Sequence, residues 1–211
     1  IHSITRGFVE RRFKRIPFEY EEFIQAIEED GPEWHGPVDY CHMVAMQLSR
    51  MVDTDNIVVL TRYPNQDEWS ISATTQRSNS GDTSESCKML CALLEQEKSE
   101  VFRDDVLEGF RYRVIQREIL DGMEALDASV VIPLIRHGKV IGAISLGDKS
   151  ANANYSSHEL TILKRIANHV AGTLYNLMTL STVAAGTRIA DIWPDWPERV
   201  GGYDIMRPVG E

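Results

Sequence analysis

The clearest pattern along the chain is a pair of apolar runs, at residues 130–135 and 140–146, that flank a short charged turn. Both runs are apolar at successive positions, which is typical of strands covered on both faces of a sheet. Gly138 in the turn can adopt the positive φ angle that tight hairpin turns require. The pattern therefore predicts a buried β-hairpin.

A long amphipathic helix is predicted after the hairpin. Ser156 and Glu159 have the spacing of a capping box, which closes the N-terminus of a helix. Apolar residues then follow at steps of three and four, the spacing of a coiled-coil heptad: Leu160, Leu163, Ala167, Val170, Leu174 and Leu177. We expect this helix to pair with a second copy of the chain in a homodimer, although a helix that packs only on its own sheet gives nearly the same pattern.

Periodicity also predicts the elements that precede the hairpin. Strands are expected at residues 56–63, 68–75 and, for a short strand, within 100–106. Helices are expected near residues 17–29, 38–52, 87–94 and 111–126.

Composition breaks divide the chain into three parts. Glycine and proline cluster near residues 30–37, and the helical periodicity ends after Ser181. We therefore expect a basic and helical linker at 1–35, a folded domain at 36–181, and a linker or docking tail at 182–211.

Composition also narrows the class of protein. With 43% hydrophobic and 26% charged residues, the chain resembles a soluble globular protein. A net charge of −10 argues against nucleic acid as a partner, because a nucleic-acid-binding domain carries a basic face. No apolar run is long enough to span a bilayer. Three cysteines, an odd number, indicate a reducing compartment rather than a disulfide framework, so we expect a cytoplasmic protein.

Charge is unevenly distributed near the N-terminal end. Residues 6–15 contain five basic residues and one acid, and residues 18–33 contain seven acids and no Lys or Arg. A basic block before a folded domain is typical of the segment that follows a membrane span on the cytoplasmic side, and a solvated basic helix fits equally well. Since the chain does not begin with methionine, we expect a piece of a longer protein, with any membrane anchor in the absent part.

Three short motifs resemble those of the GAF domain family. They are Ile-Pro-Leu at 132–134, Ile-Gly-Ala-Ile at 141–144, and the aromatic-Ser-x-x-acid helix cap at 155–159. The resemblance covers about residues 36–181. It implies an α+β fold with a central antiparallel sheet, helices on one face, a small-molecule pocket on the other, and long N- and C-terminal helices.

The same resemblance implies a role in signal transduction. GAF domains are mostly regulatory, often dimerise through terminal helices, and act on an adjacent effector domain. The segment "VERRFKRIPFEYEEF" at 9–23 is similar to the linker after the membrane region of some sensor histidine kinases of two-component systems. The closing "GYDIMRPVGE" resembles the first strand of Ser/Thr protein kinases but contains only Gly210 of their Gly-rich loop. The sequence therefore does not identify the effector domain.

The resemblance also implies where a ligand binds. In the family the pocket is bounded by the sheet and by segments between the third helix and the hairpin. Arginines beside aromatic residues can bind an anionic or aromatic ligand by paired hydrogen bonds and stacking, although each arginine also fits a solvated helix face. The ligand and any cofactor stay unknown, and the candidate residues are Trp69, Arg103, Phe110, Arg111, Tyr112 and Arg113.

A second motif bears on nucleotide binding. Nucleotide-binding GAF domains carry an Asn-Lys, a Phe and an acid, and this chain offers Asp148-Lys149, Tyr155 and Glu159. The match is partial. We expect a contact between Lys149 and an acid that holds the loop, rather than a nucleotide site.

A GAF-type enzyme is the competing class. Free methionine sulfoxide reductases use a thiolate and resolving cysteines, for which Cys87 or Cys91 would be the candidates. That family has a cysteine shortly before the strand that matches residues 130–134, where this chain has none. Cys87 and Cys91 share a predicted helix face with Leu90 and Leu94, so we expect them in the core.

Other chemistry finds no support in the sequence. Cys41-His42 resembles a bilin attachment site but falls in the first helix of the domain rather than beside the pocket. The sequence has no metal-binding or phosphate-binding motif. We therefore expect the domain itself not to be an enzyme. A third possibility is a ligand-free dimerisation platform, which predicts a pocket filled by the chain's own side chains.

Overall fold

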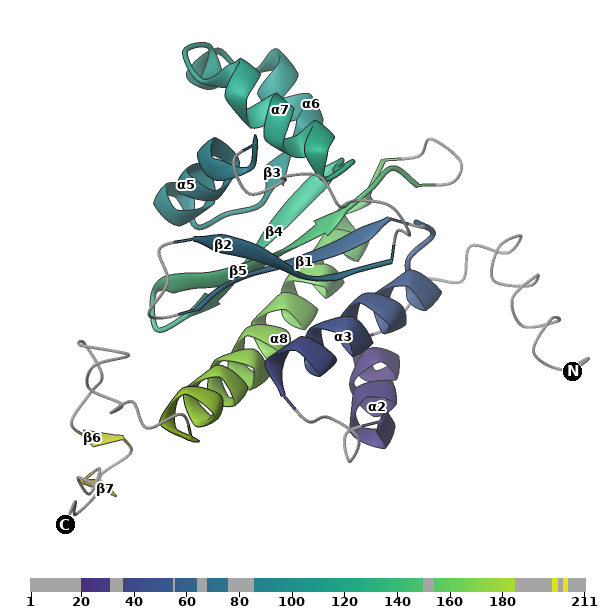
Figure 1. Ribbon diagram of the computed structural model, residues 1–211. Helices are drawn as coiled ribbons and strands as arrows, with labels where there is room; N and C mark the ends of the chain where they lie inside the picture. Colours follow the sequence, from purple (N-terminus) through teal and green to yellow (C-terminus); the bar gives the residue numbers. More distant parts are fainter. Residues whose placement is uncertain are drawn as a thin grey trace, which may run out of the picture.

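The computed structural model describes residues 20–30, 36–54, 56–63, 68–75, 86–149, 154–184, 199–200 and 203–204. Over these residues the chain forms a central antiparallel sheet with helices on both of its faces (Figure 1). No helix among them is long and apolar enough to cross a membrane.

The central sheet has five strands in the order β2-β1-β5-β4-β3, and every neighbouring pair is antiparallel. Its strands are β1 (Ile57–Arg62), β2 (Trp69–Thr74), β3 (Val101–Phe102), β4 (Val130–Arg136) and β5 (Lys139–Leu146). A separate ladder pairs two short strands, β6 (Arg199–Val200) and β7 (Tyr203–Asp204).

The hairpin predicted from the sequence occupies the centre of this sheet. β4 and β5 pair along their length, with Ile132 opposite Ile144. The two residues of the turn, His137 and Gly138, have φ angles of 49° and 73°. A two-residue turn with positive φ at both positions matches the right-handed twist of the strands that it joins. The prediction of a hairpin with a positive φ at Gly138 is therefore confirmed.

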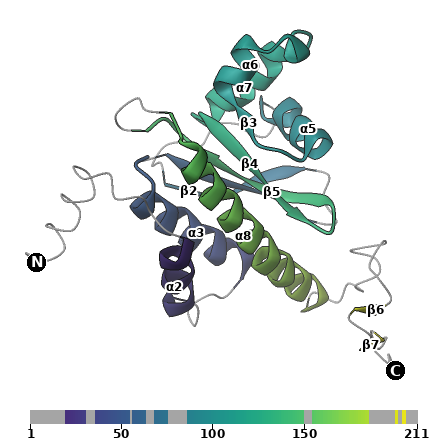
Figure 2. The same cartoon turned by 180° about the vertical axis from the view of Figure 1, so that it is seen from behind.

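Two helices cover one face of the sheet and a third packs on those two, as Figure 2 shows from behind. They are α2 (Tyr20–Asp30), α3 (Pro37–Met51) and α8 (Ser157–Ala184). Val44 and Leu48 of α3 and Ile166 and Val170 of α8 are fully buried against the apolar side chains of the strands. The predicted apolar stripes of α3 and α8 therefore face the sheet, and that of α2 faces these two helices.

The other face carries α5 (Lys88–Glu97), α6 (Arg103–Glu108), a 3₁₀ turn (Phe110–Tyr112) and α7 (Gln116–Ala125). The antiparallel α+β class is confirmed, but helices lie on both faces rather than on one. The physical reason is the composition of the central strands, whose side chains are apolar on both sides and must be covered on both. The buried strand residues of this second layer are Val58, Leu60, Val101, Val131 and Ala143.

The helix α2 lies within the segment expected to be a linker at 1–35. Its residues Phe23 and Ile27 are buried in the core that it shares with α3 and α8. The part of this segment that the structure describes, residues 20–30, therefore packs as a third helix on the domain. The basic block at 6–15 and most of the expected tail at 182–211 lie outside the described residues.

The heptad residues of α8 take part in this same core. Leu163, Ala167, Val170 and Leu174 are buried, and Leu160 and Leu177 are half-buried. Packing on the chain's own sheet therefore accounts for the heptad pattern, and dimerisation through α8 stays a prediction. Leu180 and Val183, near the end of the helix, are exposed instead.

Candidate functional site

An open cleft of about 360 Å³ lies at the edge of the central sheet, where β3 leads into α6 and β5 leads toward α8. The strand register explains why these segments meet, because Phe102 pairs with Val130, and Val130 pairs in turn with Leu146. The residues directly after Phe102 and Leu146, and those directly before Val130, therefore lie next to one another at this edge of the sheet. The cleft is lined by Phe102, Arg103, Asp104, Asp105, Ser129, Asp148, Lys149, Asn154 and Tyr155.

An ion pair between Arg103 and Asp148 crosses the cleft. Nη2 of Arg103 donates to both carboxylate oxygens of Asp148, at 2.6 and 2.7 Å, and to Oγ of Ser129 at 3.2 Å. The Ser129 hydroxyl also donates to the Asp148 carboxylate. These hydrogen bonds, from Ser129 and then from Arg103, hold the pKa of Asp148 below its usual value. Asp148 is therefore a charged acceptor at neutral pH.

A second ion pair connects the cleft to α8. Nζ of Lys149 lies 2.6 Å from Oε1 of Glu159, in the first turn of that helix. The other carboxylate oxygen of Glu159 accepts from the backbone N–H and the hydroxyl of Ser156, both at 2.8 Å. The Glu159 N–H donates back to the Ser156 hydroxyl at 3.3 Å. The predicted capping box and the predicted contact between Lys149 and an acid are both confirmed.

Tyr155 closes the loop between these two ion pairs. Its hydroxyl donates to the carbonyl oxygen of Gly147 at 2.7 Å, and the Lys149 ammonium lies 5.5 Å from the centre of its ring. Burial raises the pKa of Tyr155 well above its usual value, so the hydroxyl stays a donor. The segment from the end of β5 to the start of α8 is thus held at both ends.

Ion pairs within the protein engage several of the charged side chains at this cleft. Of the charged residues that line it, Arg103 and Asp148 pair with each other and Lys149 pairs with Glu159 of α8; Asp104 and Asp105 also line it. No cluster of His, Cys, Asp or Glu in the described part of the chain is placed to hold a metal ion. An incoming polar ligand would have to exchange places with one of the existing partners.

The six candidate ligand-binding residues lie in three separate places. Arg103 alone lines the cleft. Trp69 lies across the sheet on β2, where its indole N–H donates to Oε1 of Glu95 at 3.0 Å. That oxygen also accepts from Arg62 at 2.8 Å. Of the six candidates named from the sequence, Arg103 therefore lines this cleft and the other five lie elsewhere.

The remaining four candidates, residues 110–113, form the 3₁₀ turn and its end. Tyr112 is buried, and its hydroxyl donates to Glu97 at 3.3 Å, while Nη2 of Arg111 lies 3.2 Å from the same carboxylate. Phe110 points to solvent, with the guanidinium of Arg113 stacked 4.2 Å from its ring centre. Whether any of the four contacts a ligand stays a prediction.

Sequence reasoning did not single out Ser129, Asp104, Asp105 or Asn154 as lining residues of the cleft. Ser129 stands directly before β4, and its backbone oxygen accepts from the N–H of Arg103 at 2.9 Å. Only the pairing of β3 with β4, two segments distant in sequence, reveals this contact. The predicted hairpin by itself identified β4 and β5 but not the edge strand beside them.

The space between the sheet and the helices α5 and α7 is filled by side chains. Leu90 and Leu94 of α5 meet Ile119 and Met123 of α7, and all four are fully buried. This is the face on which the resemblance placed a small-molecule pocket. Over the described residues this face has a packed apolar core, and a ligand pocket on it stays a prediction.

The three cysteines are free and buried. Burial raises the pKa of Cys87 to about 11 and that of Cys41 to about 12, and it raises the pKa of Cys91 further still. Because a thiolate is the reactive form, these thiols are unreactive at neutral pH. The geometry therefore gives no support to a redox enzyme built on Cys87 or Cys91.

The fold described above is that of a small α+β domain built on a five-stranded antiparallel sheet. The model of the GAF domain family matches residues 37–174, and the chain belongs to this family. No curated protein sequence is significantly similar to the chain.

Several solved structures share the fold. Residues 122 to 287 of a methyl-accepting chemotaxis protein superpose with a TM-score of 0.56 and 14% identity, covering 73% of this chain and 97% of that one. The GAF domain of an Acinetobacter phosphoenolpyruvate-protein phosphotransferase gives a TM-score of 0.53 and 12% identity, over 80% and 96% of the two chains. The type II free methionine-R-sulfoxide reductase of Thermoplasma acidophilum gives 0.50 and 17%, over 67% and 94%. At these identities the likeness concerns the fold, and an enzyme activity is neither confirmed nor excluded.

Proposed function

We propose that this GAF domain senses a small polar molecule in the cleft at Arg103 and passes the signal to an adjacent effector domain through α8. The observation that carries the proposal is the position of Arg103. It lines the cleft and is held there by Asp148, which belongs to the segment leading into α8. A ligand that replaces Asp148 on Arg103 would release that segment.

The chemistry of the cleft defines the class of ligand. A guanidinium binds planar anionic groups through two hydrogen bonds, so a carboxylate or a phosphate is the natural competitor of Asp148. Asp104 and Asp105, at the start of α6, would accept hydrogen bonds from a donor group on the same molecule. We propose a small metabolite that carries one anionic group and at least one hydrogen-bond donor.

The route to α8 follows consecutive contacts. Asp148 is adjacent to Lys149, which pairs with Glu159, and Glu159 caps the first turn of α8 through Ser156. When Asp148 leaves Arg103, the constraint on Lys149 weakens and the N-terminus of α8 loses part of its cap. A ligand shifts such an equilibrium only as far as it binds one arrangement better than the other.

The parent protein in this proposal is a cytoplasmic signal-transduction kinase that resembles sensor histidine kinases and functions as a homodimer. Heptad spacing along α8 and the exposed Leu180 and Val183 support pairing through the end of that helix. The buried residues Leu163 and Val170 are used by the chain's own core. We therefore place the dimer contact toward the C-terminal end of α8.

A ligand-free dimerisation platform is the second candidate function. The observation in its favour is the packed core between the sheet and the helices α5 and α7. In that case the pair of Arg103 and Asp148 would be a permanent structural contact rather than a switch.

Native mass spectrometry of the freshly purified protein separates these two functions. The sensory function predicts a discrete added mass that is lost in Arg103→Gln and retained in Arg62→Gln. Arg62 is a suitable control because it also pairs with a carboxylate, Glu95, at 2.8 Å, but outside the cleft. A wild-type protein without added mass, before and after incubation with cell extract, would favour the platform. The same spectrum reports whether the chain is a dimer.

A further inference from the structure

One end of the domain exposes a group of apolar side chains. The solvent-exposed fraction is 54% for Leu107, in the last turn of α6, and 77% for Phe110 and 92% for Val114, in the segment that joins α6 to α7. Single exposed apolar residues are ordinary on a protein surface, but three of them within eight residues, at the end of α6 and in the connection that follows, form a patch. We refer to Leu107, Phe110 and Val114 as the apolar tip.

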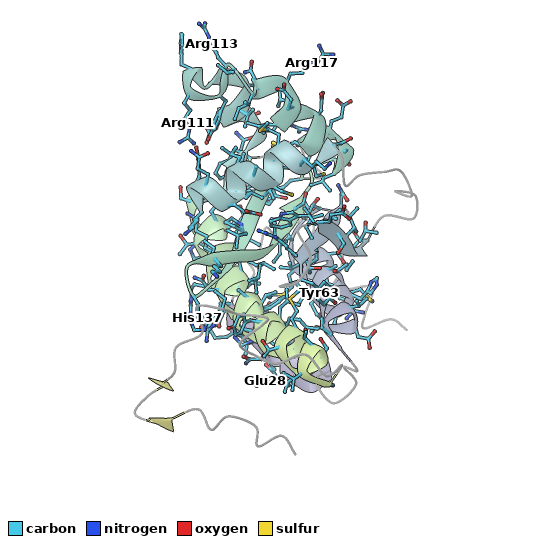
Figure 3. All side chains as sticks on the ribbon, turned by 60° about the vertical axis from the view of Figure 1, so that its left-hand side comes forward. Glu28, Tyr63, Arg111, Arg113, Arg117 and His137 are labelled. Carbon is cyan, nitrogen blue, oxygen red and sulfur yellow. The ribbon has the colours of Figure 1, made fainter. Side chains whose placement is uncertain are left out.

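Arginines surround the apolar tip. Figure 3 shows Arg111, Arg113 and Arg117 at the same end of the molecule, with Arg113 and Arg117 projecting away from it. Glu28, on the acidic helix α2, lies at the opposite end in this view. Residues 107–118 carry these three arginines and two acids, Glu108 and Glu118, so this end has a net charge of +1 in a chain whose net charge is −10.

The side chains of the tip are available for contact. Arg111 is engaged with Glu97, but the structure gives Arg113 and Arg117 no ion pair within the described part of the chain. Arg113 instead stacks on Phe110, which places a cation directly beside the most exposed aromatic ring. A ring and a guanidinium presented together fit a surface with an apolar layer beneath a layer of anionic groups.

We propose that the apolar tip docks the domain on a membrane surface that contains anionic lipids. Phe110 and Val114 would enter the boundary between headgroups and acyl chains, and Arg113 and Arg117 would bind lipid phosphates or carboxylates. A protein partner is less well matched, because three side chains on one projecting turn cover far less than the ~800 Å² per partner of a stable interface. A lipid surface needs no complementary shape. The acids at the other end of the molecule are screened by salt over this distance.

Sedimentation with lipid vesicles tests the proposal on the chain of residues 1–211. We expect the protein to bind vesicles of phosphatidylcholine mixed with phosphatidylserine, and to bind phosphatidylcholine alone much more weakly. Phe110→Ser should weaken binding about tenfold. Arg113→Gln and Arg117→Gln should each weaken it about fivefold, and added salt should have the same effect. These side chains are exposed, so the variants should keep the wild-type circular dichroism spectrum and melting temperature.

Matched variants elsewhere provide the controls. Met46→Ser removes an exposed apolar side chain from α3, and Arg50→Gln removes an exposed arginine from the same helix; neither should change binding. Wild-type protein that sediments with neither kind of vesicle would overturn the proposal and leave the tip to a protein partner. Binding that survives Phe110→Ser and Arg113→Gln but is lost in Arg11→Gln/Arg12→Gln would also overturn it, since the basic block at 6–15 would then be responsible.

Discussion

Lys149 and Glu159 lie ten residues apart in the sequence, and their charged atoms lie 2.6 Å apart across the junction between β5 and α8. The side chains are only 13% and 21% exposed, so water screens the pair weakly. Glu159 also receives two hydrogen bonds from Ser156 and thereby caps the helix. One carboxylate therefore connects the cleft, the loop and the helix that leaves the domain.

Replacing Lys149 should loosen this junction. We expect Lys149→Met to lower the free energy of unfolding by about 1–2 kcal/mol, because Glu159 would stay half-buried without its cation. The matched control is Lys164→Met, which removes a pair with Glu100 in which the lysine is far more exposed. That control should cost well under about 1 kcal/mol in urea denaturation. Equal losses in the two variants would mean that the junction has no special role.

The pH dependence of stability should report the same carboxylate. Burial of Glu159 disfavours its charge, but hydrogen bonds from Lys149 and Ser156 outweigh this and lower its pKa in the folded protein. A carboxyl group with a lowered folded pKa stabilises the fold above its unfolded pKa, about 4.3, and this stabilisation is lost as the pH falls through the folded value.

Wild-type protein should therefore lose stability on acidification below about pH 4.3, and Glu159→Gln should lose less over the same interval. Urea denaturation at a series of pH values measures both slopes. Parallel slopes for the two proteins would show that Glu159 does not carry this dependence.

Two glycines within helices should respond in opposite directions to alanine. A Cβ at Gly122 of α7 would lie 2.9 Å from the carbonyl oxygen of Ser86 and 3.2 Å from Cβ of Leu90, so Gly122→Ala should destabilise the fold by about 1–3 kcal/mol. A Cβ at Gly172 of α8 would meet nothing within 4 Å. Gly172→Ala should therefore stabilise the fold by about 0.5–1 kcal/mol through the higher helix propensity of alanine. Thermal denaturation distinguishes the two, and destabilisation by Gly172→Ala would contradict the packing described for α8.

The cysteines should not react with thiol reagents in the folded protein. All three are buried, and their thiol pKa values are raised by burial. Ellman's reagent should therefore label none of them at neutral pH within minutes, and all of them after unfolding in guanidinium chloride. Rapid labelling of Cys87 or Cys91 in native protein would revive the redox enzyme as an alternative, to be checked by turnover of free methionine sulfoxide.

Local signals in the sequence were sufficient for much of the fold. The turn at Gly138, the capping box at Ser156 and Glu159, and the apolar stripes of the long helices each depend on residues close in sequence, and each is confirmed. Such signals depend on short-range periodicity and capping chemistry. The contact between Lys149 and an acid was predicted differently, from the partial match to a motif of nucleotide-binding GAF domains, and it is confirmed with Glu159.

The cleft could not be predicted in this way. Arg103 and Asp148 are 45 residues apart and meet only because β3 pairs with β4 and β4 pairs with β5. The sequence also could not show whether the heptad residues of α8 pack in the chain's own core. A helix that packs on a sheet and a helix that pairs in a dimer have the same spacing of apolar residues. The second helical layer follows from strands that are apolar on both faces, a feature that was visible in the hairpin but not carried through to the expected fold.

The most direct test of the account asks whether the cleft communicates with α8. Hydrogen–deuterium exchange should be measured on wild-type protein, on Arg103→Gln and on the control Arg62→Gln, with attention to the amides of Glu159 and Leu160. If Asp148 restrains the start of α8 through Lys149, these two amides should exchange about tenfold faster in Arg103→Gln and at the wild-type rate in Arg62→Gln. Unchanged exchange at the start of α8 in Arg103→Gln would contradict the account, because the cleft and the helix would then be independent.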